Sequence, residues 1–257
     1  MNILFPADYF NKRSADEAFS DQWNAFKAAG FSCHTLDAET LSAKSVTPSL
    51  PEGAVVLYRG YMLSPDQYGD LHRSIAALGA TMLTGPDQYA LCHYIPNWYS
   101  LIKEYTPETV FFPDVDAAIA GIEQLSWDGF FIKDYVKSLK TSLGSQIRDR
   151  SQLLDVVAEM KKFRGRIEGG LSIRRIEQLK PETERRIFIK NGRAYMPDGS
   201  PPPQIIEQVA ARIAAPFFSV DIIENDAGNL RVIEIGDGQV SDIVGWSAEA
   251  FVKIFQG

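Results

Sequence analysis

The sequence contains few of the residues that build disulfide or metal frameworks. Two cysteines, Cys33 and Cys92, and three histidines occur among its 257 residues. Two distant cysteines cannot form a disulfide framework or a metal cage, so we expect both to be small packing residues. No histidine has another histidine four residues away, and no HExxH-type pattern is present, which argues against zinc chemistry.

Long apolar runs and an excess of basic charge are also missing. No run approaches the roughly 18 apolar residues that span a bilayer. The first residues, MNILFPADYF, lack the basic flank and apolar stretch of a secretory signal, so we expect a cytoplasmic protein. The net charge of −7 and the pI near 5.1 leave no broad basic surface, so we expect neither nucleic acid nor membranes as partners.

What is present is enough apolar sequence, 45%, to bury a core in about two domains. Strand and helix patterns alternate over roughly the first 90 residues, and this alternation predicts an open, mostly parallel α/β sheet. The predicted strands are 2–5, 31–37, 54–60 and 81–85, and the predicted helices are 14–29, capped by Ser14, and 65–78, which opens at Ser64-Pro65.

The pattern changes after residue 90, where strands begin to dominate. An aromatic-rich helical segment, 88–104, is broken near Pro96. The remaining predicted strands are 109–112, 129–136, 170–177, 184–196, 217–224 and 230–236, and the remaining helices are 115–125, 150–163 and 203–214. This order predicts an α+β region with antiparallel pairing.

Two acidic residues interrupt the last two strands. Between these strands, Asp226-Ala227-Gly228-Asn229 predicts a tight turn with Ala227 and Gly228 as its two loop residues. In that register Asp221 faces Glu234, and like charges directly opposite each other are destabilising. A divalent cation held by oxygen ligands would remove the repulsion. The alternative is a register shifted by one residue, which would send one acid to solvent.

Basic residues follow two other predicted strands. Lys133 and Lys137 are four residues apart on one strand, which places them on one face with Tyr135. Two ammonium groups together favour an anion such as a phosphate chain, and the alternative is a solvated strand face. Arg59 ends the third strand, where open α/β sheets bind ligands, so it could bind a substrate carboxylate or form a surface ion pair.

These features together resemble the ATP-grasp superfamily, which includes D-alanine–D-alanine ligase and glutathione synthetase. Asp221 and Glu234 on consecutive strands are similar to its magnesium-binding end. The stretch FFIKDYVKS is similar to its strand with a phosphate-binding lysine, and SLKTSLGS takes the place of its mobile loop over the phosphates. The whole chain resembles a compact clade marked by an arginine and two lysines.

The resemblance implies a domain organisation. Residues 1–90 would form an open parallel-sheet pre-ATP-grasp domain of α/β class. Residues 91–257 would form a two-lobed ATP-grasp domain of α+β class, with lobes at about 91–170 and 171–257.

The resemblance also implies roles for individual residues, with ATP and Mg²⁺ as cofactors. In IEQLKPETE, Glu177 and the backbone at Gln178 and Leu179 would contact adenine, and Glu184 would hold the ribose. The implied phosphate contacts are Lys133, Lys137 and Lys140, the implied catalytic residues are Lys133, Lys137 and Arg186, and the implied metal ligands are Asp221, Glu234 and Asp237. Arg174 and Arg175 compete with Arg186 for its role.

Two departures from the family pattern stand out. Gly236 occupies the place of the usual third metal ligand, an asparagine, with Asp237 beside it. The segment HYIPNWYS lacks the lysine that often precedes the first grasp lobe, which leaves that charge to Lys137 or Lys140.

The implied activity is ATP-dependent amide or peptide bond formation between a carboxylate and an amine through an acyl phosphate, with release of ADP and phosphate. The alternatives are a catalytically silent nucleotide-binding module and a kinase that stops at phosphoryl transfer. The second substrate could be an amino acid or another small molecule, a small peptide or a protein terminus.

Overall fold

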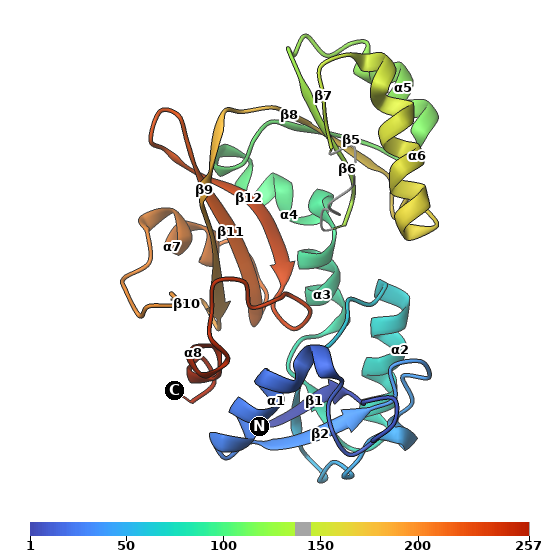
Figure 1. Ribbon diagram of the computed structural model, residues 1–257, viewed down its shortest axis with the longest axis vertical. Helices are drawn as coiled ribbons and strands as arrows, with labels where there is room; N and C mark the ends of the chain where they lie inside the picture. Colours follow the sequence, from blue (N-terminus) through green and yellow to red (C-terminus); the bar gives the residue numbers. More distant parts are fainter. Residues whose placement is uncertain (137–144, 257) are drawn as a thin grey trace. The chain divides into compact units, whose positions relative to one another are not determined.

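The computed structural model describes residues 1–136 and 145–256 (Figure 1). The chain divides into two compact units. Unit 1 comprises Met1–Leu91, Arg186–Val220 and Gly236–Gly257, and unit 2 comprises Cys92–Arg185 and Asp221–Ile235.

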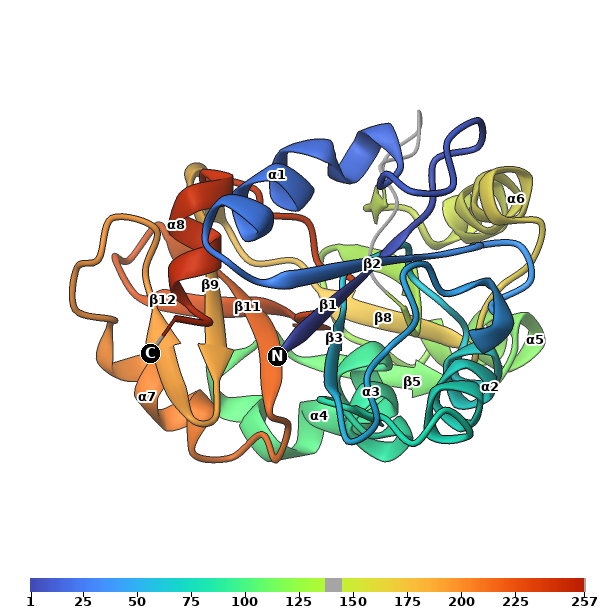
Figure 2. The same ribbon diagram turned by 90° about the horizontal axis from the view of Figure 1, so that it is seen from below.

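Unit 1 contains the parallel sheet that the alternating pattern predicts. Its strand order is β2-β1-β3-β4, and each neighbouring pair is parallel. The strands are β1 (Asn2–Pro6), β2 (Ser32–Leu36), β3 (Val55–Tyr58) and β4 (Thr81–Met82). Helices α1 (Ser20–Ala28) and α2 (Pro65–Ala76) lie on opposite sides of the sheet (Figure 2).

Alternate residues of the strands enter two apolar cores. Ile3 and Phe5 of β1 pack in one core with α1 and with the C-terminal helix α8 (Ala248–Lys253). Leu4 of β1 and Val56 of β3 pack in the other core with α2. Since successive side chains of a strand point to opposite faces, both faces of the sheet are covered.

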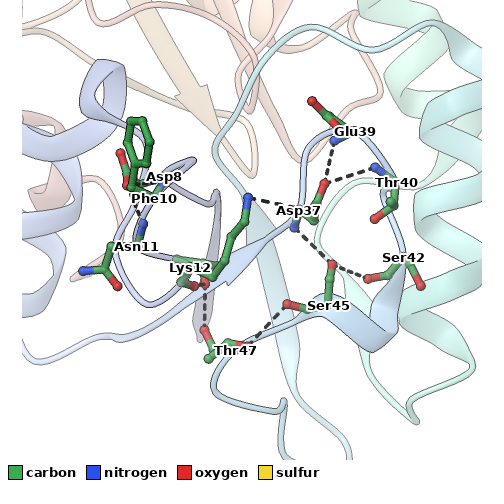
Figure 3. A network of polar contacts seen from close by, with 11 residues as sticks. Asp8, Phe10, Asn11, Lys12, Asp37, Glu39, Thr40, Ser42, Ser45 and Thr47 are labelled. Carbon is green, nitrogen blue, oxygen red and sulfur yellow. Dashed lines mark hydrogen bonds and ion pairs between the residues drawn. The ribbon is translucent and has the colours of Figure 1, made fainter.

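Polar contacts hold the loops at the carboxyl ends of β1 and β2 (Figure 3). The Thr35 hydroxyl donates to the Lys12 carbonyl at 2.6 Å, and Lys12 Nζ lies 3.7 Å from Asp37 Oδ2. The Asp37 carboxylate accepts the backbone N–H groups of Glu39 and Thr40, which lowers its pKa. These loops are therefore ordered by their own side-chain-to-backbone bonds.

Unit 2 contains an antiparallel sheet of order β5-β8-β6-β7. Its strands are β5 (Thr109–Phe112), β6 (Phe130–Asp134), β7 (Gln146–Ile147) and β8 (Leu171–Arg175). Helices α5 (Val115–Ile122) and α6 (Leu153–Arg164) lie on the same side of this sheet (Figure 1). They cover the face that carries Ile132, Leu171 and Ile173, so polar residues at the alternate positions point to the other face.

The last strands form a third sheet of order β10-β9-β11-β12. They are β9 (Leu179–Lys190), β10 (Arg193–Tyr195), β11 (Phe217–Asn225) and β12 (Leu230–Asp237), with helix α7 (Gln204–Ala210) in the chain between β10 and β11. β9, β11 and β12 each pass from unit 2 into unit 1. The aromatic-rich segment before β5 forms α3 (Pro86–His93) and α4 (Ile95–Ile102).

Two predicted element boundaries were wrong. The first helical region starts at the 3-10 helix η1 (Glu17–Phe19), and its cap is Asp16, because the Ser14 hydroxyl bonds the Asn11 carbonyl instead. β6 ends at Asp134, so Tyr135 lies beyond the strand. Lys137 and Lys140 fall outside the described residues, and the prediction that Lys137 shares a strand face with Lys133 is untested.

Within residues 1–136 and 145–256, no helix combines the length and apolarity that crossing a membrane requires.

Candidate functional site

The face of the unit 2 sheet away from α5 and α6 carries buried charges. Lys133 of β6 lies opposite Ser172 of β8, and Arg174 of β8 lies opposite Thr109 of β5. Lys133 is 2% exposed and Arg174 is 7% exposed. Lys133 Nζ lies 3.4 Å from Glu234 Oε2, which belongs to β12. Two cations and a carboxylate are thus buried together within unit 2.

Burial and neighbouring charges act in opposite directions on these cations. Burial lowers the pKa of Lys133, the Glu234 carboxylate raises it, and Arg174 lowers it further. Burial also lowers the pKa of Arg174 to about 10, against the raising effect of Glu234. Because a second positive group penalises each cation, an anion bound here would be stabilised by both.

Arg174 does not use all its donors. Its Nη1 donates to the Ile233 carbonyl at 2.7 Å, and its Nε donates to Thr109 Oγ1 at 3.3 Å. Arg174 Nη2 and the neighbouring Ser172 Oγ are buried and have no hydrogen-bond partner among the described residues. Unsatisfied buried donors cost free energy, so their presence on this face fits a site that accepts a polar ligand.

The hairpin of the two predicted metal ligands differs from its predicted form. Asn225 N–H donates to the Asn229 carbonyl, and Gly228 has a φ of +80°, so the loop holds three residues instead of two. The pairing next to the turn is therefore shifted by one residue. At the far end, Gly238 N–H donates to the Phe217 carbonyl, as the predicted register requires.

The shift between these ends coincides with the acidic residues. Along β12, Val232 and Ile235 are buried, whereas Ile233 and Glu234 between them are both half-buried. This break in alternation indicates an extra residue in the strand beside Glu234. Asp221 of β11 is buried and belongs to the same unit as Glu234. Both carboxylates are oxygen ligands of the type that Mg²⁺ prefers.

The third predicted ligand, Asp237, belongs to unit 1. Its Oδ1 accepts the backbone N–H of Gln239 at 3.0 Å and the Gln239 side-chain amide at 3.2 Å. Burial raises its pKa to about 7. Among the described residues, no three histidine, cysteine or acidic side chains lie close enough to hold a metal ion. A magnesium site with one or two carboxylates and phosphate oxygens needs no third protein ligand, so the residues still fit this ion.

The predicted adenine contacts line a pocket in unit 2. This pocket has a volume of about 1020 Å³, and its walls include Tyr99, Thr106, Glu177, Gln178 and Arg231. Both oxygens of Glu177 accept hydrogen bonds from Arg231, each at 2.8 Å. The predicted contacts Leu179 and Glu184, on β9, are half-buried and exposed. Their proposed roles toward adenine and ribose stay predictions.

Arg59, the predicted carboxylate ligand, points into unit 1 and is 1% exposed. Its five N–H donors make five hydrogen bonds: two to Gln22 Oε1, and one each to the carbonyls of Gly238, Gln239 and Ser241. Burial lowers its pKa to about 10. Binding a substrate carboxylate would require some of these bonds to break, so that role stays a prediction.

Arg186, the remaining predicted catalytic residue, belongs to unit 1. Its Nη1 donates to the Asp242 carbonyl at 3.0 Å, and its own carbonyl accepts the Trp246 indole N–H. Its competitor Arg174 lies with Lys133 and Glu234, and the other competitor, Arg175, is exposed and lies 3.6 Å from Glu108.

Sequence reasoning missed Arg231 and gave Arg174 a secondary place. The strand alternation could have singled out Arg174, because it shares parity with Ser172, and Ser172 pairs with Lys133. No local signal identifies Arg231, since its partners lie 54 and 127 residues away in the chain.

Comparison with known proteins agrees with this architecture. Residues 100–254 match an ATP-grasp domain family, described as family 3 of the clade named for one arginine and two lysines. No curated protein has significant sequence similarity to the chain.

Three solved structures illustrate the similarity of fold. The RimK domain protein ATP-grasp from Sphaerobacter thermophilus is 12% identical, with 100% of both chains covered and a TM-score of 0.64. D-alanyl-alanine synthetase A from Vibrio cholerae is 13% identical, covering 100% of this chain and 93% of its own, with a TM-score of 0.65. The ATP-grasp ligase PsnB, complexed with minimal precursor, Mg and ADP, is 10% identical, covering 99% and 97%, with a TM-score of 0.60.

At these identities the three structures establish the fold alone. The family match, which covers more than half of the chain, establishes membership and confirms the resemblance drawn from the sequence. This chain therefore belongs to the ATP-grasp domain family, in family 3 of the clade of one arginine and two lysines.

Proposed function

We propose that this protein is an ATP-dependent ligase that joins a carboxylate to an amine. In this reaction a substrate carboxylate attacks the γ-phosphate of ATP, which gives an acyl phosphate and ADP. The amine then attacks the acyl carbon, phosphate leaves, and an amide forms. The observation that carries this proposal is the burial of Lys133 and Arg174 beside Glu234 on one polar sheet face, in a chain of the ATP-grasp family.

Lys133 and Arg174 would stabilise the phosphate charge. Lys133 Nζ donates to Glu234 Oε2 in the structure, and a phosphate oxygen can take the same donor. Arg174 Nη2 and Ser172 Oγ supply two further donors on this face. Charge that develops during phosphoryl transfer is best stabilised by groups that are already oriented and shielded from water.

Asp221, Glu234 and Asp237 are the residues proposed to hold magnesium. The ion would neutralise charge on the phosphates and help to orient them. Asp221 and Glu234 supply oxygen ligands within unit 2, and Asp237 would complete the set only by giving up its bonds to Gln239.

The remaining sequence-based roles complete the proposal. Residues 1–90 act as a pre-ATP-grasp domain, and 91–257 as the ATP-grasp domain with its two lobes. Glu177, Gln178 and Leu179 bind adenine, and Glu184 binds the ribose. Lys137 and Lys140 contribute phosphate contacts from outside the described residues.

The carboxylate and amine substrates are proposed to be small molecules, peptides or protein termini. The similar ligase PsnB is complexed with a minimal precursor, and the similar macrocyclase MdnC from Microcystis aeruginosa is bound with the precursor peptide MdnA. These complexes support testing peptides beside single amino acids.

The test is nucleotide turnover with pooled acceptors. Purified protein is incubated with MgATP and separate pools of amino acids, peptides and other amines, and ADP, AMP, phosphate and condensed products are measured. We expect slow ADP release alone, faster release with the correct pool, and a product formed by loss of water. Lys133→Met should abolish the acceleration, whereas Lys162→Met, on the exposed face of α6, should retain it. AMP in place of ADP would refute the acyl-phosphate route.

A second candidate is supported by Gly236, which stands where the family usually has a metal-binding asparagine. Incomplete metal coordination would favour a nucleotide-binding module or a kinase. Tight MgATP binding without ADP formation in any pool would support the module, and a phosphorylated product without an amide would support the kinase.

A further inference from the structure

The junction between β8 and β9 is tied to β12 by one arginine. Arg231 Nε donates to Glu177 Oε2 and Arg231 Nη2 donates to Glu177 Oε1, each at 2.8 Å. Such a paired contact uses the planar geometry of guanidinium and carboxylate, which a lysine cannot reproduce. Both side chains are largely buried in the wall of the unit 2 pocket.

Arg231 also reaches a third element. Its Nη1 donates at 3.0 Å to the carbonyl of Glu104, in the 3-10 helix η3 (Lys103–Tyr105) that follows α4. The tight turn of the same hairpin adds a second tie, since Asp226 N–H donates to the Gln178 carbonyl at 3.1 Å. The segment 177–178 is therefore fixed on two sides by groups from one hairpin.

The geometry leaves the Glu177 carboxylate able to bind a ligand. A carboxylate has about four lone-pair sites, and Arg231 takes one on each oxygen. The remaining sites can accept an amino group in the pocket, and Arg231 fixes their direction. An amino donor is favoured there, whereas a ligand carbonyl oxygen in the same place would face the negative charge.

We propose that Arg231 is a positioning residue that orients Glu177 and so sets the preference of the pocket for an amino-bearing purine over an oxo-bearing purine. This inference rests on the proposed function, because it takes the pocket as the base end of a nucleotide site. Arg231 acts through Glu177 and needs no contact with the nucleotide.

The test is direct binding of ATP and GTP analogues that cannot be hydrolysed, measured by displacement of a fluorescent nucleotide with Mg²⁺ present. Wild-type protein should prefer the ATP analogue. Arg231→Ala should weaken ATP-analogue binding at least tenfold and GTP-analogue binding less, so that the preference narrows. Arg231→Lys, which keeps the charge but not the paired geometry, should show the same narrowing. Added guanidinium ion should partly restore the preference of Arg231→Ala.

Arg175→Ala is the matched control, since Arg175 lines the same pocket but is exposed and pairs with Glu108 instead of Glu177. It should leave the preference unchanged. Glu177→Ala should narrow the preference as much as Arg231→Ala, and the double variant no further, because the two residues act as one unit.

Three results would overturn the inference: an unchanged preference in both Arg231 variants, an equal loss for both analogues, or the same narrowing in Arg175→Ala. A wild-type protein that binds neither analogue would instead refute the proposed function, and the inference with it. Comparing the melting temperatures of the variants separates a folding defect from a lost preference, and Arg231→Lys remains informative if Arg231→Ala does not fold.

Discussion

Two buried arginines of this protein have opposite hydrogen-bonding situations. Arg59 in unit 1 uses all five N–H donors on Gln22 and on three backbone carbonyls, and its guanidinium lies 4.7 Å from the centre of the Phe251 ring. Arg174 in unit 2 bonds Thr109 and Ile233, but its Nη2 is buried without a hydrogen-bond partner among the described residues. Burial lowers the pKa of both to about 10.

The difference separates a structural cation from one suited to a ligand. A buried charge is tolerated when its donors are satisfied, and Arg59 meets this condition within its own unit. Arg174 has unused hydrogen-bonding capacity and lies near a second buried cation, Lys133. The number of satisfied donors, rather than burial or pKa, therefore identifies the face of the unit 2 sheet as the candidate ligand site.

The largest expected effect is on stability and tests this contrast directly. Arg59→Met should lower the free energy of unfolding by about 3–5 kcal/mol, because it leaves the carbonyls of Gly238, Gln239 and Ser241 buried and unpaired. Arg174→Met should cost at least about 2 kcal/mol less, on the order of the loss of its two existing bonds. Urea unfolding of both variants measures the difference. Equal destabilisation would contradict the contrast.

The next prediction concerns the pH dependence of the unit 1 cluster. Burial raises the pKa of Asp237 to about 7, so the folded carboxyl keeps its proton to a higher pH than the unfolded one, whose pKa is about 3.9. Its contribution to stability is therefore greatest below about pH 4 and is lost as the pH rises to about 7, by roughly 4 kcal/mol at most. Asp237→Asn should remove this decline. Unfolding curves at several pH values, recorded with a chelator, measure it, and an unchanged pH dependence would contradict the burial argument.

A catalytic prediction follows for Lys133. Lys133→Met should lower kcat by about 10²- to 10³-fold, in addition to any rise in KM for ATP, because the lysine stabilises charge as the phosphoryl group transfers. Lys137→Met, at the second predicted phosphate lysine, is expected to lower kcat as well. Steady-state kinetics with the identified acceptor give both constants. A raised KM with normal kcat would limit both lysines to ground-state binding.

The smallest predicted effect concerns the ribose. If Glu184 holds the ribose hydroxyls, Glu184→Ala should reduce the preference for ATP over a 2′,3′-dideoxy analogue by more than tenfold, since a hydrogen bond to a charged group contributes roughly 1.5–3 kcal/mol. Glu182→Ala, at an exposed position two residues earlier on β9, is the matched control. The same preference in wild type and Glu184→Ala would rule out the role.

Local sequence signals predicted the fold well where local interactions decide it. The Ser64 cap of α2 forms the capping box with Gln67, and the parallel order of β1–β3 follows from the alternation of strands and helices. The turn before β12 was predicted one residue too short, because the asparagines at its ends pair with each other and leave Gly228 to take the positive φ.

The candidate site was predicted less completely, because distant contacts decide where long side chains point. Arg59 was placed correctly at the end of β3, yet its partners at Gly238, Gln239 and Ser241 lie about 180 residues away and turn it into unit 1. In the same way, Arg231 and Glu177 are 54 residues apart. No periodicity or spacing in the sequence reports such pairs.

The most direct test of the central claim is the magnesium dependence of ATP-analogue binding by Asp221→Asn and Glu234→Gln. If the unit 2 face binds the phosphates and these carboxylates hold magnesium, wild-type affinity should rise with Mg²⁺, and each variant should lose most of that rise while keeping a wild-type melting temperature or higher. Removing one carboxylate relieves like-charge repulsion, which explains the undiminished stability. Wild-type affinity and wild-type magnesium dependence in both variants would contradict the account.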